Sequence, residues 1–451
     1  MIYKDKRVLV CGMAKSGISA ACLLNTLGAK VILQDKKGRE EIKAPEALEQ
    51  QGISLFLGKN PEEIVEAQDL VVLSPGIPSD LPFILQAENV GIPVISEVEL
   101  AYTLTPCPVT AITGTNGKTT TTTLVGQIMQ ETKPNTAVVG NIGVSYSGEV
   151  SRLKPADWVV AEISSFQMEK AKTFRPHISA VLNISPDHLN RHKTMETYIA
   201  MKERVFINQT AEDFCILNYN DQICRSMVEK AKAKVFFFSS QDPLAEGIYL
   251  AGDTIHVRWE GLEEALLSVH DLKVLGTHNY ENVMAAAAMS IVAGVPLATI
   301  RKVLENFAGV AHRIEYVATV DGVEYYNDSK GTNTDASIRA VLAMKKPIVL
   351  IGGGYDKGVS FDAWTKLFAG RVKHLVLIGV TAAQIKASAE KHGFHEISLC
   401  KTFEEAVSLC RKKAAQGDCV LLSPACASWG MFDNYEQRGE MFKELVKKFE
   451  K

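Results

Sequence analysis

Residues 114–120, Gly-Thr-Asn-Gly-Lys-Thr-Thr, have the residue types and spacing of a loop that binds phosphate groups. A β-branched run at 109–113 precedes this loop, and a segment that can form a helix follows it. Glycines let backbone N–H groups approach phosphate oxygens, and a helix N-terminus adds its dipole. Lys118 would then reach the outer phosphates, and the Thr119 hydroxyl would bind Mg²⁺. A turn that only caps a helix is the alternative interpretation.

The loop departs from the strict phosphate-loop pattern at one position. That pattern has glycine five residues before Gly117, where this chain has Ile112, and the glycine lies at Gly114 instead. We therefore expect a tighter loop than in ordinary P-loop NTPases.

Acidic and imidazole side chains follow two later apolar runs. Glu162 ends the run 158–161, and a carboxylate at a strand end downstream of a phosphate loop fits the acid that holds Mg²⁺ or its water. A purely structural role would need an ion-pair partner, because a buried carboxylate without one is costly. Asp187 and His188 follow the run 181–184, and this pair suits a second metal or a phosphate contact.

Further polar positions have a structural explanation beside a functional one. His192 follows the Asp-His pair, and we expect it at the surface. Lys202 lies in an amphipathic helical pattern at 197–206, so spacing alone predicts an exposed lysine. Asn279 and Asn282 share a face of a first helical turn and could contact a base or a ribose. Helix capping is the competing explanation for this pair.

The first hundred residues have the pattern of a nucleotide-binding β-α-β unit. Strand-like runs at 7–11 and 30–34 flank a glycine-containing turn and an Ala/Leu-rich segment, and Asp35 lies where a ribose-binding acid would. Ala14 replaces the glycine that lets a pyrophosphate approach, so a single nucleotide is favoured over a dinucleotide. The run 70–73 ends in Ser-Pro-Gly, and strand ends of this kind line ligand crevices. Turn residues without a ligand are the alternative. The candidate contacts are Lys15, Ser16, Asp35, Ser74 and Gly76.

The last third of the chain again alternates strand-like runs with polar clusters. The segment 306–315 is interpreted as a hinge followed by a strand, and Arg313 could cross to nucleotide phosphates from another domain. Runs at 323–327, 348–351 and 419–423 each end in polar residues, as the strands of a doubly wound sheet do.

Composition limits the class of protein. At 451 residues the chain is too long for one compact domain, and we expect two or three. With 46% hydrophobic and 22% charged residues it matches ordinary globular proteins, and a net charge of −3 gives no reason to expect nucleic acid as a partner. No apolar run approaches the roughly 18 residues that span a bilayer, and we expect no secretory signal. Nine cysteines without Cys-x-x-Cys pairs argue against disulfides or zinc, so we expect a cytoplasmic α/β enzyme.

Four motifs occur in the order in which the Mur ligase family carries them. They are the loop at 114–120, His-Asn-x-x-Asn at 278–282, His-Arg at 312–313 and Asp-Ser-Lys-x-Thr-Asn at 328–333. The chain therefore resembles the Mur ligases, ATP-dependent amide-bond-forming enzymes of peptidoglycan precursor synthesis, over nearly its whole length. The segment from 423 onward resembles the member that uses D-glutamate, and the Asp-Asn-Pro-Arg segment of the diaminopimelate- or lysine-adding member is absent.

The resemblance implies an α/β fold of three domains. These would be a Rossmann-like N-terminal domain at 1–96, a central P-loop ATPase-type domain at 97–309 and a C-terminal Rossmann-like domain at 310–451. It also implies ATP-dependent addition of D-glutamate to UDP-N-acetylmuramoyl-L-alanine through an acyl phosphate, with Mg²⁺ or Mn²⁺ and release of ADP and phosphate. Hinges near Ser96 and Gly309 would let the domains close on ATP, because an acyl phosphate hydrolyses in water. We expect a monomer.

Functional residues of the family carry over position by position. The catalytic residues would be Lys118, Glu162, His188 and Lys202, and the metal ligands Thr119, Glu162, His188 and Lys202. Lys202 matches a lysine that is carbamoylated in the family, which turns a cation into a metal-binding carboxylate. The ATP contacts would be Gly114, Thr115, Asn116, Gly117, Lys118, Thr119, Thr120, Asn279, Asn282, Arg313 and Asp328. The contacts with the UDP-linked substrate would be Lys15, Ser16, Asp35, Lys36, Ser74, Gly76, Asn141 and His188. The D-glutamate contacts would be Lys330, Thr332, Lys357, Ser428 and Tyr435.

Three other classes of protein share parts of this pattern. Folylpolyglutamate ligases share the phosphate loop but not the N-terminal Gly-x-Ala-x-x-Gly domain. An NAD-dependent dehydrogenase would use residues 12–35 but would leave the phosphate loop unexplained. A non-catalytic nucleotide switch would leave the N-terminal and C-terminal polar clusters without a role.

Overall fold

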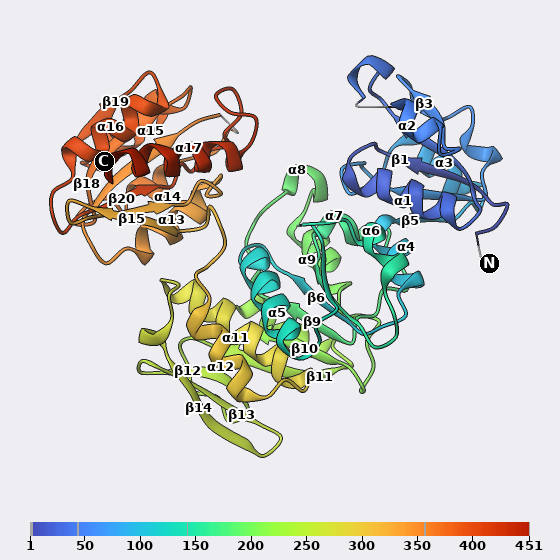
Figure 1. Cartoon of the computed structure of the whole chain (residues 1–451), viewed down its shortest axis with the longest axis horizontal. Coiled ribbons are helices and arrows are strands. Elements are labelled where there is room, and N and C mark those ends of the chain that lie inside the picture. Colours follow the sequence, from blue (N-terminus) through green and yellow to red (C-terminus); the bar gives the residue numbers. More distant parts are fainter. Residues whose placement is uncertain (1–2, 43–44, 142, 356–357, 451) are drawn as a thin grey trace. The chain divides into compact units, whose positions relative to one another are not determined.

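Three β-sheets organise the part of the chain that the computed structural model describes, residues 3–42, 45–141, 143–355 and 358–450 (Figure 1). Helices pack against each sheet, so the α/β class and the three sheet-based parts expected from the sequence are confirmed. The chain forms two compact units, 1–269 with 281–304 and 270–280 with 305–451. The domain boundaries proposed from the sequence stay a prediction. None of the helices in the described ranges is long and apolar enough to cross a bilayer.

The N-terminal sheet is parallel and has the strand order β3-β2-β1-β4-β5. Its strands are β1 (Arg7–Cys11), β2 (Lys30–Asp35), β3 (Ser54–Leu57), β4 (Leu70–Leu73) and β5 (Val94–Ser96). Its helices are α1 (Lys15–Thr26), α2 (Pro45–Glu49) and α3 (Pro82–Asn89). The apolar runs of β1 and β4 are buried, as expected for parallel strands covered by helices. The strand order reverses between β1 and β4, and the carboxyl ends of strands at such a reversal are where open α/β sheets bind ligands.

Two glycines allow the turn after β1 to pack against α1. Gly12 has a φ of +96°, a conformation that favours glycine. A Cβ built on Gly17 would lie 1.8 Å from the carbonyl oxygen of Gly12 and 2.5 Å from Ser74 Oγ. The Ser74 hydroxyl donates to the Gly12 carbonyl at 3.1 Å. The turn after β1 and the loop after β4 are therefore held together.

The central sheet has the order β14-β13-β12-β11-β10-β9-β6-β8-β7 within the described residues. β6, which leads into the phosphate loop, lies between β8 and β9 and is parallel to both. The segments that follow these three strands therefore share one edge of the sheet. The strands are β6 (Val109–Thr113), β7 (Thr136–Gly140), β8 (Trp158–Glu162), β9 (Ile178–Val181), β10 (Phe214–Asn218), β11 (Lys234–Ser239), β12 (Gly247–Ala251), β13 (Thr254–Trp259) and β14 (Leu262–Ser268). The helices are α4 (Glu97–Leu104), α5 (Lys118–Thr132), α6 (Tyr146–Glu149), α7 (Ser165–Met168), α8 (Leu189–His192), α9 (Met195–Glu203), α10 (Gln222–Ser226), α11 (Thr277–Val292) and α12 (Leu297–Asn306).

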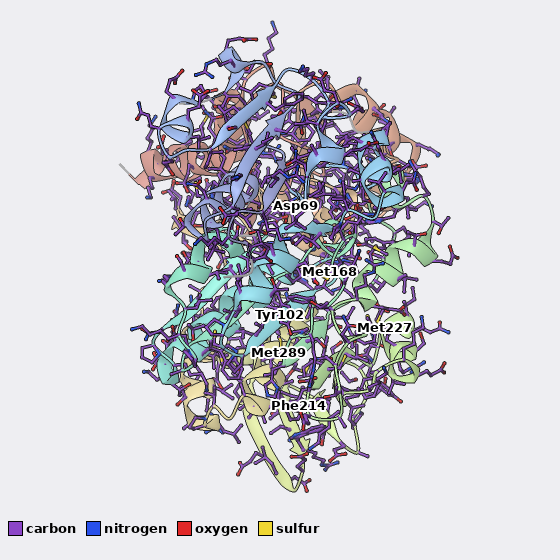
Figure 2. The ribbon with its side chains drawn as sticks, turned by 90° about the vertical axis from the view of Figure 1, so that its right-hand side faces the viewer. Asp69, Tyr102, Met168, Phe214, Met227 and Met289 are labelled. Atoms are coloured by element: carbon purple, nitrogen blue, oxygen red, sulfur yellow. The ribbon has the colours of Figure 1, made fainter. Side chains whose placement is uncertain are left out.

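A large apolar core lies beneath the central sheet. Met168 and Met227 are buried in it, and Tyr102 of α4 packs against it (Figure 2). α4 begins directly after β5, where the side chain of Ser96 caps the helix by accepting from the N–H of Glu99. The helix that follows the N-terminal sheet is thus anchored in the core of the central sheet.

The second unit contains a six-stranded sheet with the order β15-β16-β20-β17-β18-β19. β16, β20 and β17 are parallel neighbours, so the polar loops after them lie along one edge. Ile348 and Leu350 face one apolar cluster while Val349 and Ile351 face another, which is the alternation expected along a buried strand. The strands are β15 (Glu315–Val320), β16 (Val323–Asn327), β17 (Ile348–Gly353), β18 (Val372–Ile378), β19 (Ile397–Leu399) and β20 (Cys419–Leu422). The helices are α13 (Thr334–Ala343), α14 (Asp362–Thr365), α15 (Ala382–Lys391), α16 (Phe403–Lys413) and α17 (Tyr435–Lys447).

We predict that Gly17→Ala destabilises the first unit. The added methyl group would overlap the Gly12 carbonyl, a backbone atom that cannot rotate away, and such overpacking costs about 1–3 kcal/mol. The urea midpoint followed by circular dichroism should fall. Gly76→Ala is the matched control, because a Cβ at that position meets nothing within 4 Å. Equal midpoints for the two variants would contradict the close approach of α1 to the Gly12 turn.

Candidate active site

The phosphate loop joins β6 to α5 as its residue types predict. α5 begins at Lys118, and Gly117 before it has a φ of +84°. A Cβ on Gly117 would lie 2.2 Å from Asn282 Oδ1, and a Cβ on Gly114 would lie 3.0 Å from Leu182 Cβ. Both glycines are therefore required by close approach of neighbouring residues. Lys118 Nζ donates to the carbonyl oxygen of Gly114 at 2.9 Å and folds over the loop.

Asn183, in the segment after β9, supports this loop, although the sequence had indicated only Asp187 and His188 in that segment. The N–H of Asn116 donates to Asn183 Oδ1 at 2.8 Å, and Asn183 Nδ2 donates to the Asn116 carbonyl at 3.1 Å. The Thr115 hydroxyl lies 3.0 Å from the hydroxyl of Tyr198. Asn183 could have been identified only by knowing that β9 is the neighbour of β6, since its sequence context is an ordinary strand end.

Glu162 lies at the end of β8 with a side chain that is 1% exposed. Its Oε1 accepts from Asn141 Nδ2 at 2.9 Å, which brings two predicted site residues together. Its Oε2 is buried and has no hydrogen-bond partner among the described residues. A buried carboxylate oxygen without a donor is costly, and a hard cation would satisfy it. Glu162 therefore fits the metal ligand expected from the sequence.

His188 and His192 differ in their surroundings. His188 precedes α8 with a φ of +54°, is half exposed, and its Nε2 lies 3.5 Å from Asp187 Oδ2. The expectation of a surface position for His192 is wrong, because this residue is 4% exposed and its Nε2 lies 2.9 Å from Ser165 Oγ. α8 turns the ring inward between Phe166 and α9, and burial lowers the pKa of the imidazole.

Lys202 is buried, so the exposed position that spacing predicted is wrong. Its side chain is 2% exposed, and its Nζ donates to the Gly114 carbonyl at 2.7 Å. α9 packs against α7, and this contact turns the lysine toward the phosphate loop. Burial lowers the pKa of Lys202 well below its ordinary value, and the nearby charge of Lys118 lowers it further. The site thus holds two lysines on one carbonyl oxygen.

The asparagine pair of α11 is divided between the two units. In the first unit, Asn282 Oδ1 accepts from Thr121 Oγ1 at 3.3 Å, which places Asn282 at the first turn of α5. In the second unit, Asn279 Nδ2 donates to the Leu275 carbonyl at 2.7 Å. Asn279 therefore contacts the backbone of the preceding segment, whereas Asn282 lies beside the phosphate loop.

In the second unit Asp328 follows β16 and is buried. Its Oδ2 accepts from Ser423 Oγ at 2.7 Å, and its Oδ1 accepts from the N–H of Ile314 at 3.3 Å. Burial raises the pKa of the Asp328 carboxyl to about 7 in spite of these hydrogen bonds. The backbone of Ile314 ties the Arg313 segment to this acid, so two of the predicted nucleotide contacts lie together.

The predicted amino-acid contacts gather around the loops after β16 and β20. Lys330 Nζ lies 5.1 Å from the ring centre of Tyr435. Arg438, which the sequence did not single out, is 1% exposed and donates to the carbonyl oxygens of Ser329 at 2.7 Å and Cys426 at 3.2 Å. It ties the two loops together from α17. Thr332 and Ser428 lie on these same loops, and Lys357 lies outside the described residues.

The predicted contacts of the N-terminal sheet lie at the carboxyl ends of β1, β2 and β4. Lys15 and Lys36 are exposed, and Asp35 accepts from the N–H of Met13 at 2.7 Å. Ser74 is 4% exposed because its hydroxyl holds the Gly12 turn. These positions also include Ser16, which is partly buried, and Gly76, which is exposed.

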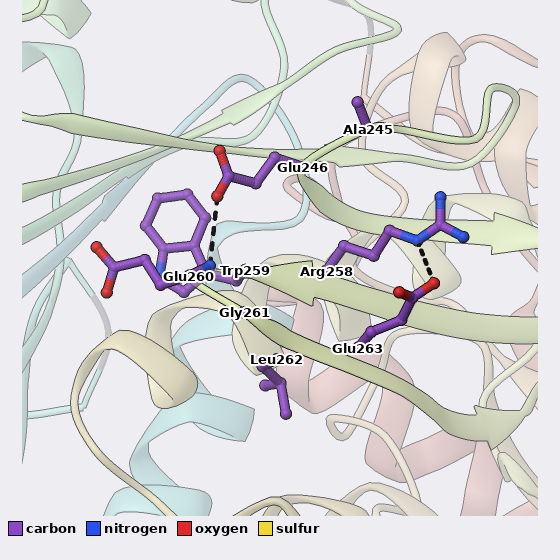
Figure 3. A pocket seen from close by; sticks show the side chains of 8 residues that line it. All are labelled: Ala245, Glu246, Arg258, Trp259, Glu260, Gly261, Leu262 and Glu263. Atoms are coloured by element: carbon purple, nitrogen blue, oxygen red, sulfur yellow. Dashed lines mark hydrogen bonds and ion pairs between the residues drawn. The ribbon is translucent and has the colours of Figure 1, made fainter.

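A separate cavity of about 380 Å³ lies over the β13–β14 hairpin (Figure 3). Trp259 in its lining stacks on Phe236 with ring centres 4.3 Å apart, and Arg258 Nε donates to Glu263 at 2.8 Å. Strands β9 to β12 lie between this hairpin and β6. The cavity is therefore not part of the phosphate-loop site.

Family models match all three sheet-based parts of the chain. The MurD-like N-terminal domain of Mur ligases matches residues 6–96, the Mur ligase middle domain 112–290, and the glutamate ligase domain of Mur ligases 312–426. These ranges contain the strand ends of the N-terminal sheet, the phosphate loop and the loop after β16.

Curated relatives match over the full length. Proteins named UDP-N-acetylmuramoylalanine–D-glutamate ligase are 51% identical in Lachnospira eligens, 48% in Lachnoclostridium phytofermentans and 46% in Clostridioides difficile. Each alignment covers 99% of this chain and 99% of the relative.

Solved structures agree on the fold. A UDP-N-acetylmuramate–alanine ligase from Thermotoga maritima aligns with a TM-score of 0.62 at 19% identity, covering 98% of this chain and 99% of that one. MurF from Acinetobacter baumannii aligns with a TM-score of 0.60 at 15% identity, covering 99% and 91%. With full-length relatives near half identity and family models over all three sheets, the chain belongs to the Mur ligase family.

Proposed function

We propose that this chain joins D-glutamate to UDP-N-acetylmuramoyl-L-alanine in an ATP-dependent reaction of peptidoglycan precursor synthesis that releases ADP and phosphate. Full-length relatives with that name, 46–51% identical to the chain, support the choice of substrates. The structural observation that carries the ATP-dependent step is the phosphate loop. There Lys118 and Lys202 both donate to the Gly114 carbonyl.

The reaction must turn a carboxylate into a group that an amine can attack. Transfer of the γ-phosphoryl group of ATP to the alanyl carboxylate gives an acyl phosphate and ADP. The amine of D-glutamate then attacks the acyl carbon, and the tetrahedral intermediate expels phosphate. The first step brings two anions into line, so positive charge must offset their repulsion, and a cation so placed contributes about 10³–10⁵ in rate. Lys118 is assigned this task.

A divalent cation, Mg²⁺ or Mn²⁺, would supply further charge neutralisation at the phosphates when bound. Glu162 is assigned as its protein carboxylate, because its buried Oε2 has no hydrogen-bond partner among the described residues. The Thr119 hydroxyl and His188 are assigned as further ligands. Within the described ranges, no three His, Cys, Asp or Glu side chains gather in a group that could hold a metal. Oxygens from the substrates and from a modified Lys202 would therefore complete the set.

Lys202 is assigned as a carbamoylated lysine. Its lowered pKa favours the neutral amine, which is the form that adds to CO₂. The new N–C bond forms as the amine loses a proton, and the product is a carbamate anion. This anion would place a negative charge beside Lys118, and it would offer oxygen ligands to a metal.

The remaining assigned contacts divide among the sheets. The strand ends of the N-terminal sheet would hold the UDP moiety, with Asn141 near the muramoyl group. The cluster around Asp328 would contact the nucleotide together with Asn282. The loops after β16 and β20 would hold D-glutamate. The acyl phosphate must be kept from water, so domain closure on ATP binding is part of the proposal.

We predict that phosphate release from ATP requires UDP-N-acetylmuramoyl-L-alanine and D-glutamate together. Lys118→Ala should abolish this release, because the charge opposite the transferred phosphoryl group is lost. The same variant should still bind the UDP-linked substrate in titration calorimetry. Lys154→Ala, which removes an exposed lysine of the same unit, is the matched control and should keep normal turnover.

Two outcomes would redirect the assignment. Equal phosphate release without the amino acid would favour a nucleotide hydrolase or switch. Loss of UDP-substrate binding in Lys118→Ala with ATP turnover retained would mean that the two ligands have been assigned to the wrong parts of the chain.

Carbamoylation of Lys202 makes a separate prediction. The protein in ¹³C-labelled bicarbonate should show a carbamate carbon resonance that Lys202→Ala lacks and Lys154→Ala keeps. Activity should also fall in buffer depleted of CO₂, because the modification is reversible and its anion is assigned to the metal. A spectrum without this resonance, in an enzyme that stays fully active after depletion, would exclude the modification.

The buried Asp328 predicts a pH dependence of stability. Its pKa is about 7 in the folded chain and about 3.9 in an unfolded one, so the folded state holds the proton more tightly. The contribution to stability is full below about pH 4 and is lost as the pH rises through 7. The urea midpoint should therefore decline less between pH 5 and 7.5 in Asp328→Asn than in the wild type. Parallel declines would show that this acid is already ionised at pH 5.

A further inference from the structure

A single guanidinium joins the loop after β4 to the segment that carries His188. Arg191 lies in α8, three residues beyond that histidine. Its Nη1 donates to the Pro75 carbonyl at 3.1 Å, and its Nη2 donates to the Ile77 carbonyl at 2.8 Å. The two carbonyls flank Gly76, the exposed tip of the loop. Arg191 of α8 thus attaches the Gly76 loop of the N-terminal sheet to the part of the chain built around the central sheet.

Arg191 is itself fixed in place. Its Nε and Nη2 donate to the two carboxylate oxygens of Glu169, each at 2.8 Å, and the guanidinium lies 4.4 Å from the ring centre of Phe166. The side chains of Arg191 and Glu169 are 16% and 11% exposed. Bidentate, charge-assisted pairs of this kind are stronger and more directional than single hydrogen bonds. Lysine cannot reproduce the arrangement, because its ammonium lacks the planar fork.

The surroundings of this arginine make its polar contacts decisive for the loop. Glu88, Glu169 and Lys170 line a cavity of about 410 Å³, so apolar side chains do not fill the space between the N-terminal and central sheets at this point. Lys170 Nζ donates to Glu88 at 2.6 Å and forms a second bridge between the N-terminal and central sheets. Of these two bridges, the one through Arg191 reaches the carbonyls beside Gly76. The two bridges can therefore be tested against each other.

We propose that Arg191 is a positioning residue for the UDP-linked substrate. It fixes the position of the Gly76 loop relative to the segment that carries His188. A substrate bound at the N-terminal strand ends then presents its carboxylate at the phosphate loop. This inference rests on the proposed function and deepens it. Arg191 acts through the loop and not on the reacting atoms, so its loss weakens substrate binding more than it slows chemistry.

Steady-state kinetics of Arg191→Ala and Arg191→Lys test the proposal. Hydrogen bonds to a charged group contribute enough that losing two of them should raise the KM for UDP-N-acetylmuramoyl-L-alanine at least about tenfold. The KM values for ATP and D-glutamate and the kcat should change by less than about threefold. Lys170→Ala is the matched control, because it breaks the other bridge and leaves the Gly76 carbonyls held. Its KM values should remain close to those of the wild type.

Calorimetric titration with the UDP-linked substrate alone separates this proposal from the function on which it rests. Wild-type binding with weaker binding by both Arg191 variants supports the proposal, and circular dichroism checks that each variant is folded. If Arg191→Ala does not fold, Arg191→Lys carries the test. Unchanged binding by the folded variants, or an equal loss in Lys170→Ala, would overturn the positioning role while leaving the ligase activity intact. A wild type that neither binds this substrate nor releases phosphate with it would overturn the proposed function itself.

Discussion

The carbonyl oxygen of Gly114 accepts hydrogen bonds from the Nζ atoms of two lysines, Lys118 and Lys202, and the rest of the first unit is arranged around that constraint. Two cations on one buried acceptor repel each other unless one is neutral or an anion lies between them. Burial lowers the pKa of Lys202 well below its ordinary value, and the charge of Lys118 lowers it further, so the neutral amine is favoured at this position. The cationic Lys118 suits the site to phosphates and carboxylates, and the buried oxygen of Glu162 offers a place for a metal cation among them.

The strand order of the central sheet brings the charged groups of the site together. Since β6 lies between β8 and β9, the phosphate loop, Glu162 and His188 come from three neighbouring strand ends. The side chain of Asn183 accepts from the N–H of Asn116 and donates to its carbonyl oxygen, so the loop keeps its shape before any ligand binds. Because the loop is already ordered, none of the binding energy of the ligand is needed to order its backbone.

Two arginines hold loops together where different elements meet. Arg438 joins the loops after β16 and β20 in the second unit, and Arg191 joins α8 to the loop after β4 in the first. Each donates to backbone carbonyls that no strand ladder satisfies. A planar group with five donors can satisfy several such carbonyls at once, which is why arginine and not lysine occupies both positions.

The amino-acid sequence by itself determined the strands that lead into the predicted site loops, the phosphate loop, the α/β class and the residue types at those strand ends, because these depend on local periodicity and on glycine chemistry. Family resemblance supplied the roles proposed for Lys202 and Asp328, which spacing did not indicate. Only the tertiary structure decided that Lys202 and His192 are buried, since helical periodicity does not say which face another helix will cover. It also revealed Asn183 and Arg191, whose partners are distant in sequence and become neighbours only through the order of the strands.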